Sequence, residues 1–158
     1  MNENLQRMIA LVGEVFDVKN DPDQLDVTPE IMQQLQLLHP ATLTQIDKDG
    51  GPILWVLVIP TTKIVMDRFL AKEISESQLC THTKPTDSFE AIYLCSATLL
   101  PEYRNQGIAK TATVGAINKI VEGYNIKALY YWEFTNEGGR LANAIAMETG
   151  LPLYVRAK

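Results

Sequence analysis

The chain has 158 residues, of which 46% are hydrophobic and 21% are charged, a composition typical of a folded globular domain. We therefore expect one domain over residues 1–158. The formal net charge of −5 argues against broad binding to nucleic acids or anionic membranes, both of which need a basic surface. Two cysteines are too few for a disulfide framework, and no signal peptide or membrane-spanning run is apparent, so we expect a cytoplasmic location.

Apolar periodicity and turn residues predict the order of elements along the chain. Thr28-Pro29 is typical of a helix start, and the Asp-Gly-Gly sequence at residues 49–51 is typical of a hairpin turn. Gly123 and Gly150 are expected to cap the ends of two helices. The predicted elements are a helix over 3–17, a loop over 19–26, a helix from Thr28-Pro29 to His39-Pro40, a hairpin of 41–46 with 52–59, a helix over 60–72, strands over 89–100 and 126–134, helices over 107–122 and 138–149, and a short strand over 151–155.

Residues 52–59 are apolar at consecutive positions, which predicts a central strand covered on both faces. Residues 73–88 are polar and contain Pro85, so we expect a mobile loop beside the binding site of an acceptor. Cys80 and His82 fall in this loop, but two ligand types without a further pair nearby do not predict a metal site.

The most informative stretch follows the apolar run of residues 91–100 and precedes the helix predicted from residue 107. The first N–H groups of a helix lack partners within the helix, and the helix dipole adds partial positive charge beside them. Gly107 permits close approach of a ligand, while Arg104 and Lys110 contribute full positive charges. A strand, a tight turn and a helix start in this order predict a site for phosphate groups.

The phosphate-loop patterns GxxxxGK[ST] and GxGxxG are both absent from this stretch. The sequence Arg104-x-x-Gly107-x-Ala109 instead resembles the R/Q-x-x-G-x-G/A loop of the GNAT family of N-acyltransferases. The resemblance implies an α/β fold with a mixed sheet and helices on both faces. It also implies acetyl-CoA or another acyl-CoA as co-substrate, an amine of a small molecule or peptide as acceptor, and no metal.

In that family, two parallel strands separate after the phosphate loop, and the pantetheine arm of the coenzyme lies between them. The resemblance therefore assigns Thr98, Leu99 and Leu100 to pantetheine, and Asn136 to the coenzyme arm. The residues assigned to the diphosphate, mostly through their backbone amides, are Arg104, Asn105, Gln106, Gly107, Ile108, Ala109, Lys110 and Thr111.

The catalytic residues match the family less well. Many members carry a tyrosine four residues before the glycine that ends the last helix, and that position is Ala146 here. The place of the mid-strand carboxylate base falls near Tyr93, whose phenol is a poor base at neutral pH. Tyr93 and Glu133 are the catalytic candidates, with Glu90 as another carboxylate and Tyr103 and Tyr131 as other acids.

Three further expectations stay open. The chain begins with a helix and contains no further long strand, so the sheet is either short or completed by a partner chain in a homodimer. An additional helix is predicted between the hairpin and the strand before Arg104. The missing tyrosine allows two alternatives to an enzyme, namely a non-catalytic module that binds or senses acyl-CoA and a structural domain whose turn binds nothing.

Overall fold

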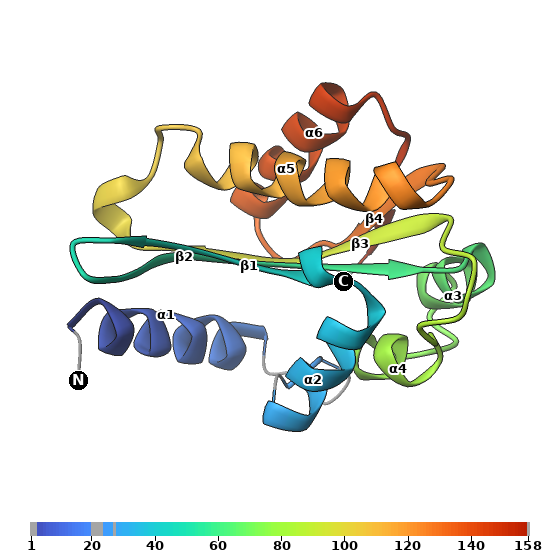
Figure 1. Ribbon diagram of the computed structural model, residues 1–158, viewed down its shortest axis with the longest axis horizontal. Coiled ribbons are helices and arrows are strands. Elements are labelled where there is room, and N and C mark those ends of the chain that lie inside the picture. The colour runs from blue at the N-terminus through green and yellow to red at the C-terminus, as the bar shows by residue number, and fades with distance from the viewer. Residues whose placement is uncertain (1–2, 20–23, 27, 158) are drawn as a thin grey trace.

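The computed structural model describes residues 3–19, 24–26 and 28–157, which form an α/β structure with one mixed sheet (Figure 1). The elements in chain order are α1 (Glu3–Lys19), α2 (Pro29–Leu38), η1 (Pro40–Thr42), β1 (Leu43–Lys48), β2 (Gly51–Thr61), α3 (Lys63–Leu70), α4 (Glu76–Thr81), β3 (Ala91–Leu99), η2 (Pro101–Tyr103), α5 (Ile108–Gly123), β4 (Ala128–Trp132), α6 (Asn136–Thr149) and β5 (Leu153–Arg156).

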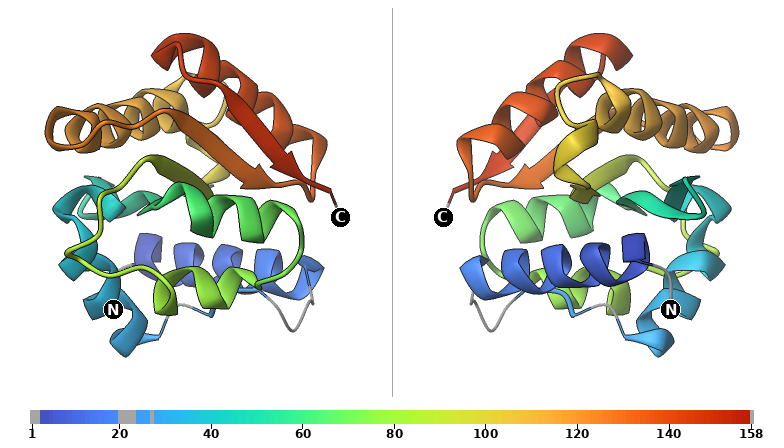
Figure 2. Two further views of the ribbon diagram at one scale, coloured as in Figure 1. Left: turned by 90° about the vertical axis from the view of Figure 1, so that its right-hand side faces the viewer. Right: turned by 90° about the vertical axis from the view of Figure 1, so that its left-hand side faces the viewer.

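The sheet has the strand order β1-β2-β3-β4-β5 and forms the middle layer of the molecule (Figure 1). Strand β2 runs antiparallel to both β1 and β3, whereas β4 runs parallel to both β3 and β5. Helices α5 and α6 cover one face, and α1 to α4 lie on the other (Figures 1 and 2). The expectation of a mixed sheet with helices on both faces is confirmed.

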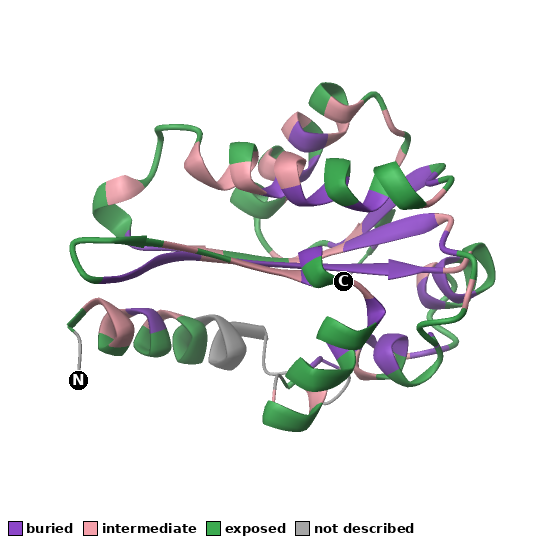
Figure 3. Cartoon of the chain, in the orientation of Figure 1, coloured by how far each residue is buried: buried purple, intermediate pink, exposed green. Residues whose placement is uncertain are grey.

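Strand β2 lies at the centre of the packing, as its apolar sequence predicts. It is buried at every position except Trp55, and both α1 and α5 pack against it (Figure 3). A second part of the core is aromatic: the ring of Phe69 lies 5.0 Å from that of Tyr93 and 5.8 Å from that of Tyr130. The Tyr130 hydroxyl shares a hydrogen bond of 2.7 Å with the Thr61 hydroxyl, so this buried polar group is satisfied.

Local signals in the sequence account for several element boundaries. The hydroxyl of Thr28 accepts a hydrogen bond from the Ile31 N–H and so caps α2. Asp49 and Gly50 adopt positive φ angles of 56° and 86°, as a tight hairpin turn requires. Gly150 caps α6 in the left-handed conformation, with φ at 72°.

Two local predictions are wrong. Residues 73–88 are not a loop throughout, because α4 lies within them and packs between α2 and α3. Its start is a capping box, in which Ser75 accepts from the Gln78 N–H and the Gln78 side chain accepts from the Ser75 N–H. Gly123 is the last helical residue of α5 rather than its cap, and the cap is Tyr124 in an extended conformation. Part of the loop predicted over 19–26 lies outside the described residues.

Candidate functional site

The parallel strands β3 and β4 separate near their middle. They pair only from Ala91–Ala128 to Tyr93–Tyr130, yet β3 continues to Leu99. In the part of the chain that the structure describes, no strand pairs with that edge of β3 beyond Tyr93, and the separation is visible in Figure 2. The register of β3 with β2 also shifts at Cys95, a β-bulge that bends the strand. The result is an unpaired edge of β3 at the carboxyl ends of parallel strands, where α/β sheets commonly bind ligands.

The unpaired edge of β3 leads into the loop between β3 and α5. Asn105 and Gly107 have φ angles of 65° and 77°, which turn the backbone sharply before the helix begins. The Thr111 N–H donates to the Gly107 carbonyl, and no side chain among the described residues caps the N–H groups at the start of α5. A Cβ built on Gly107 meets nothing within 4 Å, so the space above the loop is open. Uncapped backbone N–H groups at a helix start are an arrangement that favours the binding of an anion.

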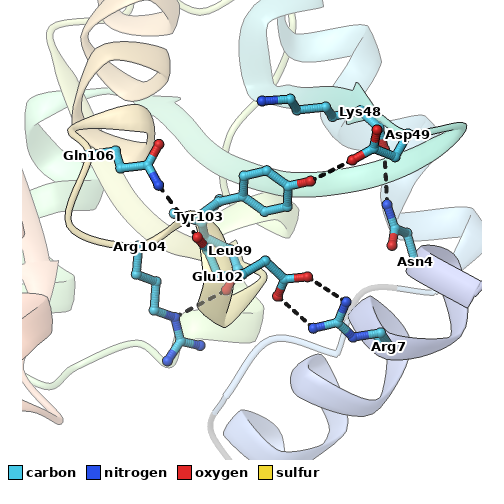
Figure 4. Close-up of polar contacts among 9 residues, drawn as sticks. All are labelled: Asn4, Arg7, Lys48, Asp49, Leu99, Glu102, Tyr103, Arg104 and Gln106. Atoms are coloured by element: carbon cyan, nitrogen blue, oxygen red, sulfur yellow. Dashed lines mark hydrogen bonds and ion pairs between the residues drawn. The ribbon is translucent and has the colours of Figure 1, made fainter.

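Two contacts between distant segments hold the base of this loop (Figure 4). Arg7 of α1 donates two hydrogen bonds of 2.6 Å to the carboxylate of Glu102, and this pairing lowers the pKa of Glu102 to about 2. The Tyr103 hydroxyl donates to Asp49 of the hairpin turn over 2.9 Å, a bond that raises the pKa of Tyr103. The loop is therefore anchored to α1 and to the hairpin.

The residues assigned to the coenzyme, apart from Asn136, follow one path from the end of β3 to the start of α5. Thr98 is half-buried, Leu99 and Leu100 are buried, residues 104–107 are exposed, and residues 108–110 at the start of α5 are half-buried. Arg104 turns back along the strand, because its Nε atom donates to the Leu99 carbonyl over 3.2 Å (Figure 4). Lys110 lies in the first turn of α5, so its charge is close to the open N–H groups.

Asn136 and Glu133 both line a shallow hollow of about 660 Å³ beside α6, apart from the loop at Gly107. The residues that line it are Tyr131, Glu133, Asn136, Gly139, Arg140, Asn143, Ala144 and Met147. Because side chains alternate along β4 and Tyr130 packs on α3, Glu133 lies on the α6 face of the sheet. Tyr93 packs on α3 as well, so the two predicted catalytic residues lie on opposite faces.

Glu76, which the sequence analysis did not single out, lies beside the strand separation. It is 1% exposed, accepts a 2.6 Å hydrogen bond from the Leu25 N–H at Oε1, and accepts one of 2.5 Å from the Tyr93 hydroxyl at Oε2. The thiol of Cys95 lies 4.0 Å from the same Oε2 atom. This cluster joins α4, the segment before α2, and β3 at the position of its bulge. The signal in the sequence that could have revealed the helix carrying Glu76 is the capping box of Ser75 and Gln78.

The surroundings of Tyr93 determine what its hydroxyl can do. Burial, reinforced by the nearby carboxyl group of Glu76, raises the pKa of Tyr93 well above its usual value. The hydroxyl therefore stays protonated and acts as a donor. Any role in taking up a proton requires that it pass its own proton to Glu76.

Among residues 3–19, 24–26 and 28–157, no three His, Cys, Asp or Glu side chains are grouped so that they could hold a metal ion. No described helix has the length and apolar character needed to cross a bilayer. Neither a protein-family model nor a curated protein matches the sequence.

Proposed function

We propose that this protein is an acyl-CoA-dependent N-acyltransferase of the GNAT type, which transfers an acetyl or other acyl group to an amine of a small molecule or peptide. The observation that supports this proposal is the separation of β3 from β4 after Tyr93, because the unpaired edge of β3 leads directly into the open loop at Gly107. An unpaired strand edge followed directly by a loop that suits phosphate groups matches a ligand with a long arm and a diphosphate.

In this proposal the loop receives the diphosphate of the coenzyme. The open N–H groups of residues 108–110 and the helix dipole supply partial positive charge, and Lys110 supplies a full one. Gly107 leaves room for the phosphate oxygens to approach the backbone. The contacts of Glu102 with Arg7 and of Tyr103 with Asp49 hold the loop in place before the ligand arrives.

The edge of β3 over residues 94–99 then offers backbone groups to the arm of the coenzyme. Six residues of strand span about 20 Å, which separates the diphosphate from the reacting end of the ligand. The thioester would lie near Cys95 and Tyr93, where the two strands part. Both residues face the side of the sheet that carries Glu76, so we expect the acceptor amine to approach from the face of α1 to α4.

Acyl transfer forms a bond from the amine nitrogen to the carbonyl carbon and breaks the bond from that carbon to sulfur. The amine loses a proton, and the departing thiolate gains one. Glu76 is the carboxyl group that lies beside this point, and the Tyr93 hydroxyl connects to it directly. We assign to this pair the uptake of the amine proton, with the backbone N–H groups of β3 as donors to the developing oxyanion.

Thermal-shift titration with acetyl-CoA tests the binding step, and acetyl-pantetheine, which lacks the diphosphate, is the matched ligand. We expect stabilisation by acetyl-CoA at millimolar concentration and much less by acetyl-pantetheine. Thiol release over a panel of amines then tests catalysis. Equal stabilisation by the two ligands, or none by acetyl-CoA, would overturn the proposal.

The second candidate is a non-catalytic module that binds or senses acyl-CoA. Ala146 supports it, since the resemblance places a tyrosine acid there and alanine donates no proton. The two candidates share the ligand and differ in turnover. Stabilisation by acetyl-CoA without amine-dependent thiol release would favour the binding module.

A further inference from the structure

Arg156 places a buried positive charge at the end of the sheet. It is the last residue of β5 and only 5% exposed. Its guanidinium carbon lies 4.5 Å from the centre of the Phe69 ring and 4.7 Å from that of the Trp132 ring. The side-chain hydrogen bonds that it makes to described residues both leave from Nη1, to the carbonyls of Ile74 over 2.9 Å and of Phe69 over 3.4 Å. None of the ion pairs among the described residues involves Arg156.

Two N–H donors in this cluster have no acceptor within the described part of the chain. They are Nε of Arg156 and Nε1 of Trp132, and both atoms are buried. A buried donor without an acceptor costs free energy, and a buried charge without a counter-ion costs more. The stacking of the guanidinium on two rings offsets part of this cost. An acceptor beside the two donors would offset the remainder, and a negatively charged acceptor would also supply the missing counter-ion.

The position of the cluster relates it to the proposed reaction. Trp132 ends β4 and pairs with Arg156 of β5, so both side chains lie at the carboxyl ends of the parallel strands. Both pack on Phe69 of α3, the same residue that packs on Tyr93. The two donors therefore lie on the face of the sheet that carries Glu76, next to the gap between β3 and β4.

We propose that Arg156 and Trp132 bind a carboxylate of the acceptor, which makes the acceptor an amine of the amino-acid type. Nε and Nη2 form one edge of the planar guanidinium, and this edge matches the two oxygens of a carboxylate. A carboxylate brings one negative charge to one buried cation, whereas a doubly charged phosphate would leave an excess. This inference rests on the proposed function for the identity of the reacting amine.

A purely structural role for the cluster makes different predictions. In that case Arg156 only joins β5 to the segment after α3, and the Nε1 atom of Trp132 contributes nothing. Replacing Trp132 by phenylalanine would then remove a buried N–H donor that has no acceptor and lower stability by the lost ring packing, with no effect on the binding of any ligand. If the donor serves a carboxylate, the same replacement weakens binding while the fold remains intact.

The experiment is a thermal-shift and calorimetric titration of the full chain with free amino acids and their matching amides, one at a time. We expect at least one amino acid to stabilise the wild-type protein, and its amide to bind about tenfold or more weakly. Arg156→Lys keeps a charge but loses the flat donor edge, so it should bind that amino acid about tenfold more weakly. Trp132→Phe should weaken binding several-fold in a protein that still unfolds cooperatively, with a melting temperature lowered only by the lost ring packing. Arg68→Lys, at an exposed arginine on α3, is the matched control and should bind as the wild type does.

The proposal is overturned if no amino acid binds, if an amide binds as well as its acid, or if Arg156→Lys and Trp132→Phe bind as the wild type does. Acetyl-CoA is titrated separately in the same samples, because its diphosphate site does not involve Arg156. Loss of acetyl-CoA binding with intact amino-acid binding would remove the proposed function and leave a carboxylate site. The opposite result would leave an acyl-CoA protein whose acceptor lacks a carboxylate at this position.

Discussion

The Tyr93 hydroxyl donates a 2.5 Å hydrogen bond to Oε2 of Glu76, which joins β3 to α4 at the point where β3 leaves β4. Tyr93→Phe removes this donor from a buried carboxyl group, and we expect a loss of about 1.5–3 kcal/mol in the free energy of unfolding. Tyr130→Phe is the matched control. Within the described part of the chain its hydroxyl bonds the neutral Thr61 hydroxyl, so its loss is expected to be about 1 kcal/mol. Urea unfolding measures both, and equal losses would show that Glu76 is not the stronger partner.

Glu76→Gln changes the acid without changing its size. If Glu76 takes up the amine proton, thiol release with a reactive amine falls about a hundredfold, while the affinity for acetyl-CoA stays nearly unchanged. Glu133→Gln is the competing variant, because Glu133 lines the hollow on the opposite face. Steady-state kinetics of the two variants decides between the carboxylates. A loss confined to Glu133→Gln would transfer the role to the α6 face.

Gly107→Ala tests the phosphate loop. Gly107 has a φ of 77°, where a Cβ costs about 1–2 kcal/mol, and its added methyl would occupy the open space above the loop. We expect this loss of stability together with about tenfold or greater loss of acetyl-CoA affinity.

Gly150→Ala is matched to it, since Gly150 has a φ of 72° and open space around its Cβ but caps the far end of α6. It should lose similar stability and keep the affinity for acetyl-CoA, as measured by calorimetry. Equal losses of affinity in the two variants would mean that the effect comes from stability alone.

Arg7→Met tests the anchor of the loop. The variant should keep its fold, because the pair with Glu102 is largely exposed, and should bind acetyl-CoA several-fold more weakly, because η2 loses its tie to α1. Lys63→Met removes another exposed pair, with Asp67, and should leave that affinity unchanged.

The Arg7–Glu102 pair also has a pH signature. In the folded protein the pKa of Glu102 is about 2, below its ordinary value of 4.5. The pair therefore stabilises the fold above pH 4.5 and loses that effect as the pH falls toward 2. The difference in melting temperature between wild type and Arg7→Met should therefore vanish over this range. A difference that persists at the acidic end would contradict the assignment.

The two cysteines should differ in reactivity. Cys80 is 5% exposed, and burial, reinforced by Glu76, raises its pKa to about 11, so it carries little thiolate at mildly alkaline pH. Cys95 is only partly buried, at the bulge of β3. An aromatic disulfide reagent should label Cys95 in the folded protein and Cys80 only after unfolding, with Cys95→Ser and Cys80→Ser to assign the signals. Acetyl-CoA should slow the labelling of Cys95, and unchanged labelling would place the ligand elsewhere.

The expectation of a homodimer concerns the edge of the sheet at strand β5. This is the outer strand of the described sheet, and its residues Tyr154 and Val155 are about half-exposed. Sedimentation measurements of the full chain would decide whether a second copy covers this edge.

The sequence by itself determined the elements that local chemistry controls. The cap at Thr28, the turn at Asp49 and Gly50, the order of the strands and of the helices other than α4, and the sharp loop at Gly107 all follow from nearby residues. The backbone preferences of glycine, proline and capping side chains act within a few residues, so they can be read along the chain.

Only the tertiary structure decided which side chains meet. Arg7 and Glu102 are 95 residues apart, and Glu76 reaches Tyr93 because α4 packs beneath β3. The separation of β3 from β4 depends on where two parallel strands stop pairing, and the buried charge of Arg156 depends on rings from two other elements. Burial and long-range pairing are properties of the packed fold, and no short stretch of sequence encodes them.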